Sequence, residues 1–258
     1  MKIALLGDVH ANLPALDAVL ADAKMRGVDQ IWNIGDFVGY GAYPDEVVKR
    51  LRNEGAISIV GNYDLKVLKF PKKNKKWRST KMHHKWLAFK WAYENLSKKS
   101  RKYLRTLPEE LWLYTSGKYF LLTHGSPASN QDHLTPDTPD ARLRELTTIT
   151  TSQWDNKVAD VIVCGHSHRE FSRQVDDSWF INTGSVGRPD DGDPRACYAV
   201  LQVGDGTFQI DHFRLDYDLA AAVAAIHDRG LPEAFAQMLI QGRDLNTVLG
   251  IQSNTHPN

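Results

Sequence analysis

Seven side chains that can bind metal ions lie in five short motifs, and each motif ends an apolar run. These residues are Asp8, His10, Asp36, Asn62, His124, His166 and His168. Carboxylate, amide and imidazole ligands without a thiolate suit Mn²⁺, Fe or Zn²⁺ better than a copper or iron–sulfur centre. The set is too large for one ion and is about the right size for two.

The spacing of the first three motifs matches the length of a βαβ unit. Asp8 and Asp36 are 28 residues apart, and Asp36 and Asn62 are 26 apart, whereas one such unit takes roughly 30 residues. The carboxyl ends of parallel strands meet at one edge of a sheet, where open α/β folds place their sites. We therefore expect these ligands to gather at such an edge.

The apolar pattern predicts an alternation of strands and helices. Strands are expected over residues 3–6, 30–34, 57–60, 119–123 and 161–164. Helices are expected over residues 12–25, 44–53, 142–154, 219–229 and 232–242. Three further β runs, residues 179–182, 197–203 and 208–213, follow one another closely and predict an antiparallel second sheet.

We interpret residues 1–244 as a single domain. Within it, residues 66–108 form an inserted basic helical cap, and residues 216–244 form the C-terminal helices. Residues 245–258 are polar and are expected to be a disordered tail.

The cap carries an unusual share of the positive charge. Between Lys66 and Arg105 there are fifteen Lys and Arg residues and one acid, Glu94, although the whole chain has a net charge of +1. Pro71 is expected to break the segment, and an amphipathic helix should follow, with the apolar stripe Trp86, Phe89, Tyr93 and Leu96. The lysines of residues 69–76 are either a solvated face or a surface that binds a polyanion, nucleic acid included.

The order of the motifs resembles the calcineurin-like metallophosphoesterase superfamily, whose pattern runs D-x-H, G-D, G-N-H-[DE], H-G and G-H-x-H. The stretch Asn-Thr-Gly-Ser-Val-Gly-Arg-Pro at residues 182–189 resembles its small bacterial and archaeal phosphodiesterase-type branch. The resemblance extends from the first strand to about Leu215. It implies an α/β fold, a four-layer α/β/β/α sandwich of two mixed sheets flanked by helices, with the cap inserted.

The resemblance also implies roles for individual residues. One metal ion would be bound by Asp8, His10 and His168. The other would be bound by Asn62, His124 and His166. Asp36 would bridge the two ions, and a hydroxide held between them would attack phosphorus. Asn12 and Arg188 are candidate contacts for the phosphate of the substrate.

The chain departs from the family pattern at Tyr63, where the superfamily usually has a histidine thought to protonate the leaving group. A phenol with an ordinary pKa near ~10 is a poor general acid at neutral pH. Asp64 would then orient Tyr63. Three interpretations stay open: a substrate whose leaving group needs no proton, weak catalysis by a protein that mainly binds, or another proton donor among His83, His84 and His133.

The sequence thus predicts a dinuclear metal-dependent phosphoric ester hydrolase. The substrate would be a phosphodiester or a phosphoanhydride, for example a dinucleoside polyphosphate. A phosphomonoesterase, protein phosphatases included, is one alternative, and a catalytically weak module that binds metal and nucleic acid is another. No apolar run approaches the ~20 residues that cross a bilayer, and Cys164 and Cys197 lie in apolar runs as expected of free thiols. We therefore expect a cytoplasmic protein.

Overall fold

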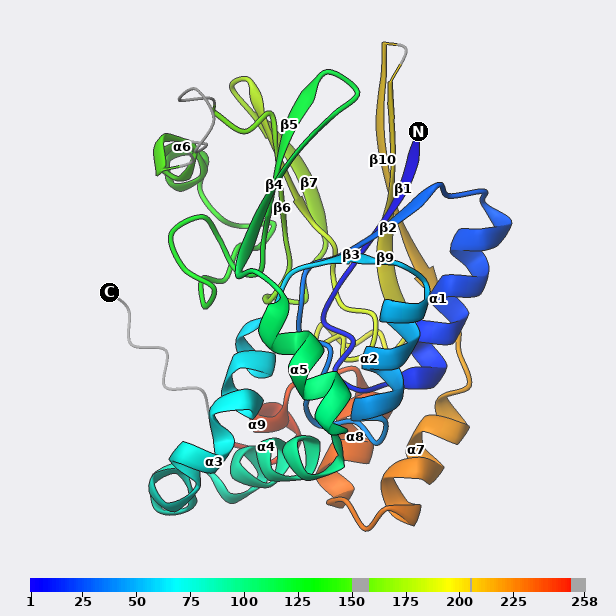
Figure 1. The fold of residues 1–258 in the computed structure, drawn as a ribbon, viewed down its shortest axis with the longest axis vertical. Coiled ribbons are helices and arrows are strands. Elements are labelled where there is room, and N and C mark those ends of the chain that lie inside the picture. Colours follow the sequence, from blue (N-terminus) through cyan, green and yellow to red (C-terminus); the bar gives the residue numbers. More distant parts are fainter. Residues whose placement is uncertain (150–157, 205, 252–258) are drawn as a thin grey trace.

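The computed structural model describes residues 1–149, 158–204 and 206–251, and contains two five-stranded sheets that face each other (Figure 1). The first sheet has the order β10 (Thr207–Leu215), β9 (Ala196–Gly204), β1 (Lys2–Leu6), β2 (Gln30–Asn33) and β3 (Ile57–Ser58). The second has the order β4 (Glu110–Thr115), β5 (Lys118–Thr123), β6 (Val161–Cys164), β8 (Ser178–Asn182) and β7 (Phe171–Val175). Both sheets are mixed, as predicted.

The prediction that the three late β runs form one antiparallel sheet is wrong. Strands β9 and β10 form an antiparallel pair that joins β1 in the first sheet, whereas β8 is parallel to β6 in the second sheet. The β4–β5 and β7–β8 hairpins each contain a strand that was not predicted. Sequence proximity favours local pairing, but the apolar residues of β9 also match the buried face of β1.

Alternate residues of β1 serve two different cores. Ile3 and Leu5 point between the sheets and contact a cluster that includes Phe120 and Val163 of the second sheet. Ala4 and Leu6 point to the opposite face, where a separate apolar cluster includes Leu16. This alternation follows from the two-residue period of a strand, and a strand buried on both faces is apolar throughout.

Helices cover the outer faces of both sheets and complete the four layers. α1 (Leu13–Met25) and α2 (Pro44–Asn53) pack on the first sheet. α6 (Asp140–Ile149) packs on the second through Leu143 and Leu146. The predicted helix 142–154 thus begins two residues earlier, and its residues 150–154 lie outside the described residues.

The basic segment forms three helices, α3 (Asn62–Thr80), α4 (His83–Asn95) and α5 (Lys98–Thr106), grouped at one end of the molecule (Figure 1). The predicted break at Pro71 is wrong, because Pro71 lies inside α3. Burial of Val67 and Phe70 just before it supports the helix there, and offsets the hydrogen bond that an interior proline removes.

The C-terminal segment is more ordered than predicted. α7 (Leu219–Asp228) and α8 (Glu233–Gln241) occur as expected, and a further helix, α9 (Leu245–Val248), lies in the predicted polar tail. Asp244 caps α9 through the backbone N–H groups of Asn246 and Thr247, and the Leu245 side chain is buried. The expectation of disorder is therefore wrong for residues 245–251, and residues 252–258 lie outside the described part.

Candidate metal centre

Five strands bring the predicted ligands to one end of the two facing sheets. Asp8 and His10 follow β1, Asp36 follows β2, and Asn62 begins α3 just after β3. His124 follows β5, and His166 and His168 follow β6. The sequence prediction of a shared edge therefore extends to both sheets.

The backbone at this edge is left-handed at most of these positions. The φ angles of five ligand residues lie between 47° and 63°, namely those of Asp8, His10, Asp36, His166 and His168. A non-glycine residue in this region costs of order 1–3 kcal/mol and persists only where the surroundings hold it. Such a concentration of strain in one place supports a functional role for the edge.

The loops after β2 and β3 approach each other so closely that both need glycine. Gly35 has a φ of 95°, and a Cβ atom there would lie 2.4 Å from the backbone nitrogen of Gly61. A Cβ atom on Gly61 would lie 2.2 Å from Oδ1 of Asp36. The two glycines therefore bring Asp36 beside the beginning of α3.

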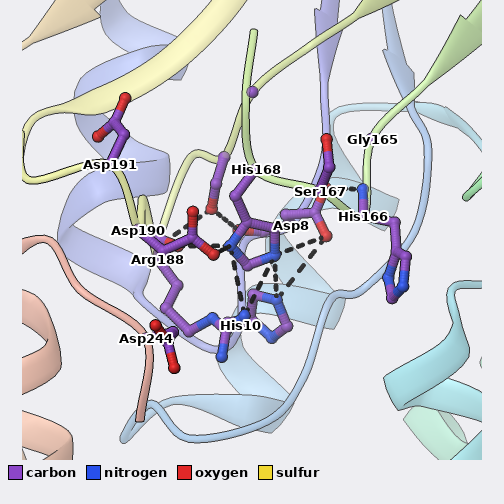
Figure 2. Close-up of polar contacts among 12 residues, drawn as sticks. Asp8, His10, Gly165, His166, Ser167, His168, Arg188, Asp190, Asp191 and Asp244 are labelled. Atoms are coloured by element: carbon purple, nitrogen blue, oxygen red, sulfur yellow. Dashed lines mark hydrogen bonds and ion pairs between the residues drawn. The ribbon is translucent and has the colours of Figure 1, made fainter. Parts of the chain in front are cut away.

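Asp8, His10 and His168 converge to form the first group (Figure 2). Nε2 of His168 lies 3.2 Å from Nε2 of His10 and 3.2 Å from Oδ1 of Asp8. All three side chains are buried. Two imidazole nitrogens and one carboxylate oxygen thus face a common point.

Asp36, His124 and His166 form the second group, and Asp36 connects it to the first. Oδ2 of Asp36 lies 3.4 Å from Nε2 of His124 and 3.7 Å from Nε2 of His10. The other oxygen, Oδ1, accepts a hydrogen bond of 2.7 Å from the backbone N–H of Tyr63. One carboxylate oxygen therefore lies between the two groups.

Several atoms of this site are buried and have no hydrogen-bond partner within the described part of the chain. They include Oδ1 of Asp8, Oδ2 of Asp36, Oδ1 of Asn62 and Nε2 of His124. An unsatisfied buried polar atom costs about 1–3 kcal/mol, and more if it is charged. Divalent ions would satisfy all four atoms, and hard oxygen and imidazole donors are the ligands that Mn²⁺, Fe and Zn²⁺ accept. The residues therefore fit two metal ions.

Backbone carbonyls hold two of the imidazoles in the tautomer that binds a metal. Nδ1 of His124 lies 2.8 Å from the carbonyl oxygen of Ile34, and Nδ1 of His168 lies 2.6 Å from that of Arg188. A carbonyl oxygen only accepts, so each Nδ1–H donates and each Nε2 is the nitrogen that faces the site. Such outer contacts orient histidine ligands in metal sites.

The charges of the site also favour cations. Burial lowers the pKa of His166 to about 2, so its imidazole is neutral and free to bind a metal. Burial also acts to lower the pKa of His124, but the negative charge of Asp36 outweighs it and raises that pKa to about 9. The carboxylate thus attracts a positive charge to His124, and a bound ion would replace the proton.

The predicted relation between Asp64 and Tyr63 is not what the structure shows. The two carboxylate oxygens of Asp64 accept hydrogen bonds from the backbone N–H groups of Val38 and Gly61. Asp64 therefore caps the N-terminus of α3. The Tyr63 phenol instead lies 2.7 Å from the phenol of Tyr40.

Burial, together with the neighbouring Tyr40, raises the pKa of Tyr63 well above its ordinary value. Its phenol thus stays protonated near neutral pH and is a weak acid. Because the Tyr40–Tyr63 pair uses one of its two O–H protons internally, the other is available to donate a hydrogen bond. The pair suits the binding of a phosphoryl oxygen better than the transfer of a proton.

Asn12 and Arg188 differ in their relation to the site. The Asn12 side chain caps α1 and donates to the carbonyl oxygen of Gly187 and to the phenol of Tyr217. It is buried and stabilises the scaffold, so we no longer expect it to contact substrate. Nη2 of Arg188 lies 3.4 Å from both ring nitrogens of His168 (Figure 2). The Arg188 guanidinium also lies over the Tyr40 ring.

A cavity of about 410 Å³ is lined by four of the candidate metal ligands. Its lining includes five residues that the sequence predicted for the site, Asp36, Asn62, His166, His168 and Arg188. The lining also includes Tyr40, Tyr63, Lys85 and His133. It is completed by residues that the sequence did not indicate for this site, which are Lys66, Gln131, Asp190, Asp244, Leu245 and Asn246. They come from loops and helices far apart in the chain, so no local pattern marks them.

Of the alternative proton donors, His133 is the one that lines the cavity, with its ring 4.4 Å from that of His166. Burial lowers the pKa of His133, so it is neutral near pH 7. His83 and His84 pack against Trp86 and Phe235 instead.

Comparison with known proteins agrees with the class that this fold and site define. The calcineurin-like phosphoesterase superfamily domain matches residues 1–206. An uncharacterized protein of Methanocaldococcus jannaschii, MJ0912, is 32% identical over 93% of this chain and 98% of its own. The chain therefore belongs to the calcineurin-like phosphoesterase superfamily, and is a metal-dependent phosphoesterase.

Solved structures show the same relationship. A metallophosphoesterase from Sphaerobacter thermophilus is 28% identical and superposes with a TM-score of 0.73, over 94% of this chain and all of the other. The hypothetical protein PH1004 from Pyrococcus horikoshii shares the fold, with a TM-score of 0.82 and 22% identity over 93% of this chain and 98% of its own. No helix in the described residues is long and apolar enough to cross a membrane.

Proposed function

We propose that this protein is a dinuclear metal-dependent hydrolase of phosphodiesters or phosphoanhydrides, with nucleotides such as dinucleoside polyphosphates among its substrates. The observation that carries the proposal is the position of Asp36 Oδ2, a buried oxygen without a partner among the described residues, between two groups of ligands. A single-metal site would not need a carboxylate oxygen shared in this way.

In this proposal, each of the two groups of candidate ligands would hold one metal ion. Asp8, His10 and His168 would hold one ion. Asn62, His124 and His166 would hold the other, and Asp36 would be common to both. Bound Mn²⁺, Fe or Zn²⁺ would supply an activated water near neutral pH and positive charge beside the phosphoryl group.

The chain's own residues would bind and orient the phosphoryl group. The Arg188 guanidinium, at the wall of the cavity, would pair with a non-bridging oxygen, and Nε of Arg188 has no partner among the described residues. The free proton of the Tyr40–Tyr63 pair would donate to a second oxygen. Asn62 would add a neutral oxygen ligand that leaves the site positive, and Asp64 would act by holding the beginning of α3.

Two other proposals concern partners and location. The exposed lysines of α3 that face solvent, Lys69, Lys72, Lys73, Lys75 and Lys76, support binding of a polyanion such as nucleic acid by the cap. The buried free thiols of Cys164 and Cys197 support a reducing compartment such as the cytoplasm.

Hydrolysis of three substrates by the Mn²⁺-loaded protein tests the proposed function. A chromogenic phosphodiester, the matching phosphomonoester and a dinucleoside polyphosphate should be compared at equal concentration. We expect turnover of the diester or the dinucleotide to exceed that of the monoester. Preference for the monoester would instead favour the phosphomonoesterase, and binding without turnover of any of the three would favour a binding module.

A further inference from the structure

One wall of the cavity carries positive charge that the protein itself does not neutralise. Lys66 of α3 and Lys85 of α4 line the cavity, and both side chains are partly buried. No ion pair of Lys66, Lys81 or Lys85 with an acid occurs among the described residues. By contrast, Lys90, on the same helix as Lys85, pairs with Glu94 at 2.8 Å.

These lysines also act on one another. Burial lowers the pKa of the Lys66 ammonium, Asp36 partly offsets this, and the charges of Lys81 and Lys85 lower it further. Nζ of Lys66 lies 5.1 Å from the centre of the Tyr63 ring, and both residues line the cavity. An anion bound here would relieve both the repulsion and the burial of an unpaired charge.

The position of Lys66 relative to the reacting group defines which anion this is. A phosphoryl group between the ions would lie beside Asp36, and the backbone N–H of Tyr63 donates a hydrogen bond to Oδ1 of Asp36. Lys66 is one helical turn further along α3 and lines the same cavity as Asp36 and Tyr63, so a group attached to that phosphoryl group would come within reach of its ammonium. An uncharged alcohol there would gain nothing from an ammonium group, whereas a second phosphate would.

We propose that Lys66, with Lys85 beside it, binds the phosphate next to the reacting one, and thereby selects substrates with two phosphates joined by an anhydride oxygen. This inference rests on the proposed function and narrows its substrate class. It also explains Tyr63, because a leaving phosphate needs neutralisation of its charge rather than a proton.

The reaction balances without a proton donor. The oxygen of one water forms a new bond to phosphorus, and the bond from that phosphorus to the bridging oxygen breaks. The electron pair stays on the bridging oxygen, which leaves as part of the second phosphate. The two protons of the water pass to solvent as both product phosphates ionise, and Lys66 stabilises the charge that develops on the leaving oxygen.

The test compares three variants of the full chain. Lys66→Met removes the charge, and Lys66→Arg keeps it. Lys24→Met is the matched control, because Lys24 is exposed on α1 outside the cavity. Each Mn²⁺-loaded variant is assayed on a dinucleoside polyphosphate, on inorganic tripolyphosphate and on bis(4-nitrophenyl) phosphate. Affinity of the metal-free protein for methylenediphosphonate, measured by calorimetry in EDTA, gives a readout that needs no turnover.

We expect Lys66→Met to lower kcat/KM on the anhydrides roughly tenfold or more, the loss of one charge-assisted contact. It should change kcat/KM on the aryl diester little and weaken diphosphonate binding by a similar factor. Lys66→Arg should retain most of the kcat/KM on the anhydrides and most of the affinity for the diphosphonate. Lys24→Met should match the wild type in both. Comparison of kcat/KM on tripolyphosphate with kcat/KM on the dinucleoside polyphosphate shows whether the substrate is inorganic or a nucleotide.

Other results overturn the inference. Equal losses on anhydride and diester, or unchanged diphosphonate binding, would show that Lys66 does not recognise a second phosphate. Wild-type turnover of the diester but of neither anhydride would leave the proposed function standing and reject the inference. If the wild type hydrolyses none of the substrates, the proposed function fails, and the diphosphonate measurement alone decides whether Lys66 binds a phosphate.

Discussion

Replacement of Asp36 by Asn should remove the ability to bind two metal ions together. In the wild type, Oδ1 accepts from the Tyr63 N–H at 2.7 Å, and Oδ2 lies between His10 and His124. An asparagine has only one oxygen. If that oxygen keeps the Tyr63 hydrogen bond, an NH₂ group faces the ions, and if it turns to the ions, the Tyr63 N–H loses its partner.

The size of the effect follows from linkage between binding and folding. At a metal concentration of about 100 times Kd, each ion stabilises the folded state by about 2.7 kcal/mol, so two ions give roughly 5 kcal/mol. For a chain of this size, 1 kcal/mol corresponds to about 2–4 °C in Tm. Mn²⁺ should therefore raise the Tm of the stripped wild type by roughly 10–20 °C, and that of Asp36→Asn by only a few degrees.

Thermal unfolding in EDTA and in Mn²⁺ measures the shift in Tm, and elemental analysis of the loaded proteins measures the number of ions bound per chain. Asp177→Asn is the control, because Asp177 is exposed in the turn between β7 and β8. It should bind close to two ions per chain and show the full wild-type shift. One ion or none in the saturated wild type, or an equal Tm shift in Asp36→Asn, would refute the dinuclear site.

Three further predictions concern other parts of the molecule. Tyr63→His should raise kcat on substrates with poor leaving groups, such as alkyl phosphodiesters, more than on anhydrides, and an equal change on both would give the phenol a role of its own. Four exposed cap lysines should be neutralised together, namely Lys72, Lys73, Lys75 and Lys76. This change should raise KM for polyanionic substrates and flatten the salt dependence of KM, with kcat and metal content unchanged. An unaltered salt dependence would show that this face is only solvated. Burial opposes ionisation of Asp22, but hydrogen bonds from Arg26 and Tyr198 lower its pKa overall, so its contribution to stability is full above about pH 4 and is lost as pH falls through the lowered pKa. Urea unfolding of Asp22→Asn at a series of pH values should show a weaker loss of stability in acid than the wild type, and parallel curves would contradict this.

The sequence alone was enough to predict the class of fold and the gathering of the candidate metal ligands at one edge. Each candidate ligand lies one to four residues beyond the end of a strand, and the spacing of Asp8, Asp36 and Asn62 repeats the length of a βαβ unit. Both are local properties, because a parallel strand ends at the same edge whatever else surrounds it. The amphipathic α1 and α2 were predictable for the same reason, since their periodicity records which face is buried.

Other features depended on contacts between distant segments. Local order suggested one antiparallel sheet for the three late β runs, but burial against β1 placed β9 in the first sheet. The partners of Asp64 and Tyr63 were equally hidden, because Val38 and Tyr40 belong to another loop.

The residues that line the cavity also combine features that the sequence shows with contacts that only the tertiary structure shows. In the sequence, Lys66 is one of fifteen basic residues of the cap, and Leu245 and Asn246 begin the predicted polar tail. Only packing of α3, α4 and α9 around the mouth of the site brings them to the metal ligands. Strand ends and spacing thus specify what chemistry the chain can perform, whereas the choice of substrate depends on side chains that meet only when distant helices pack together.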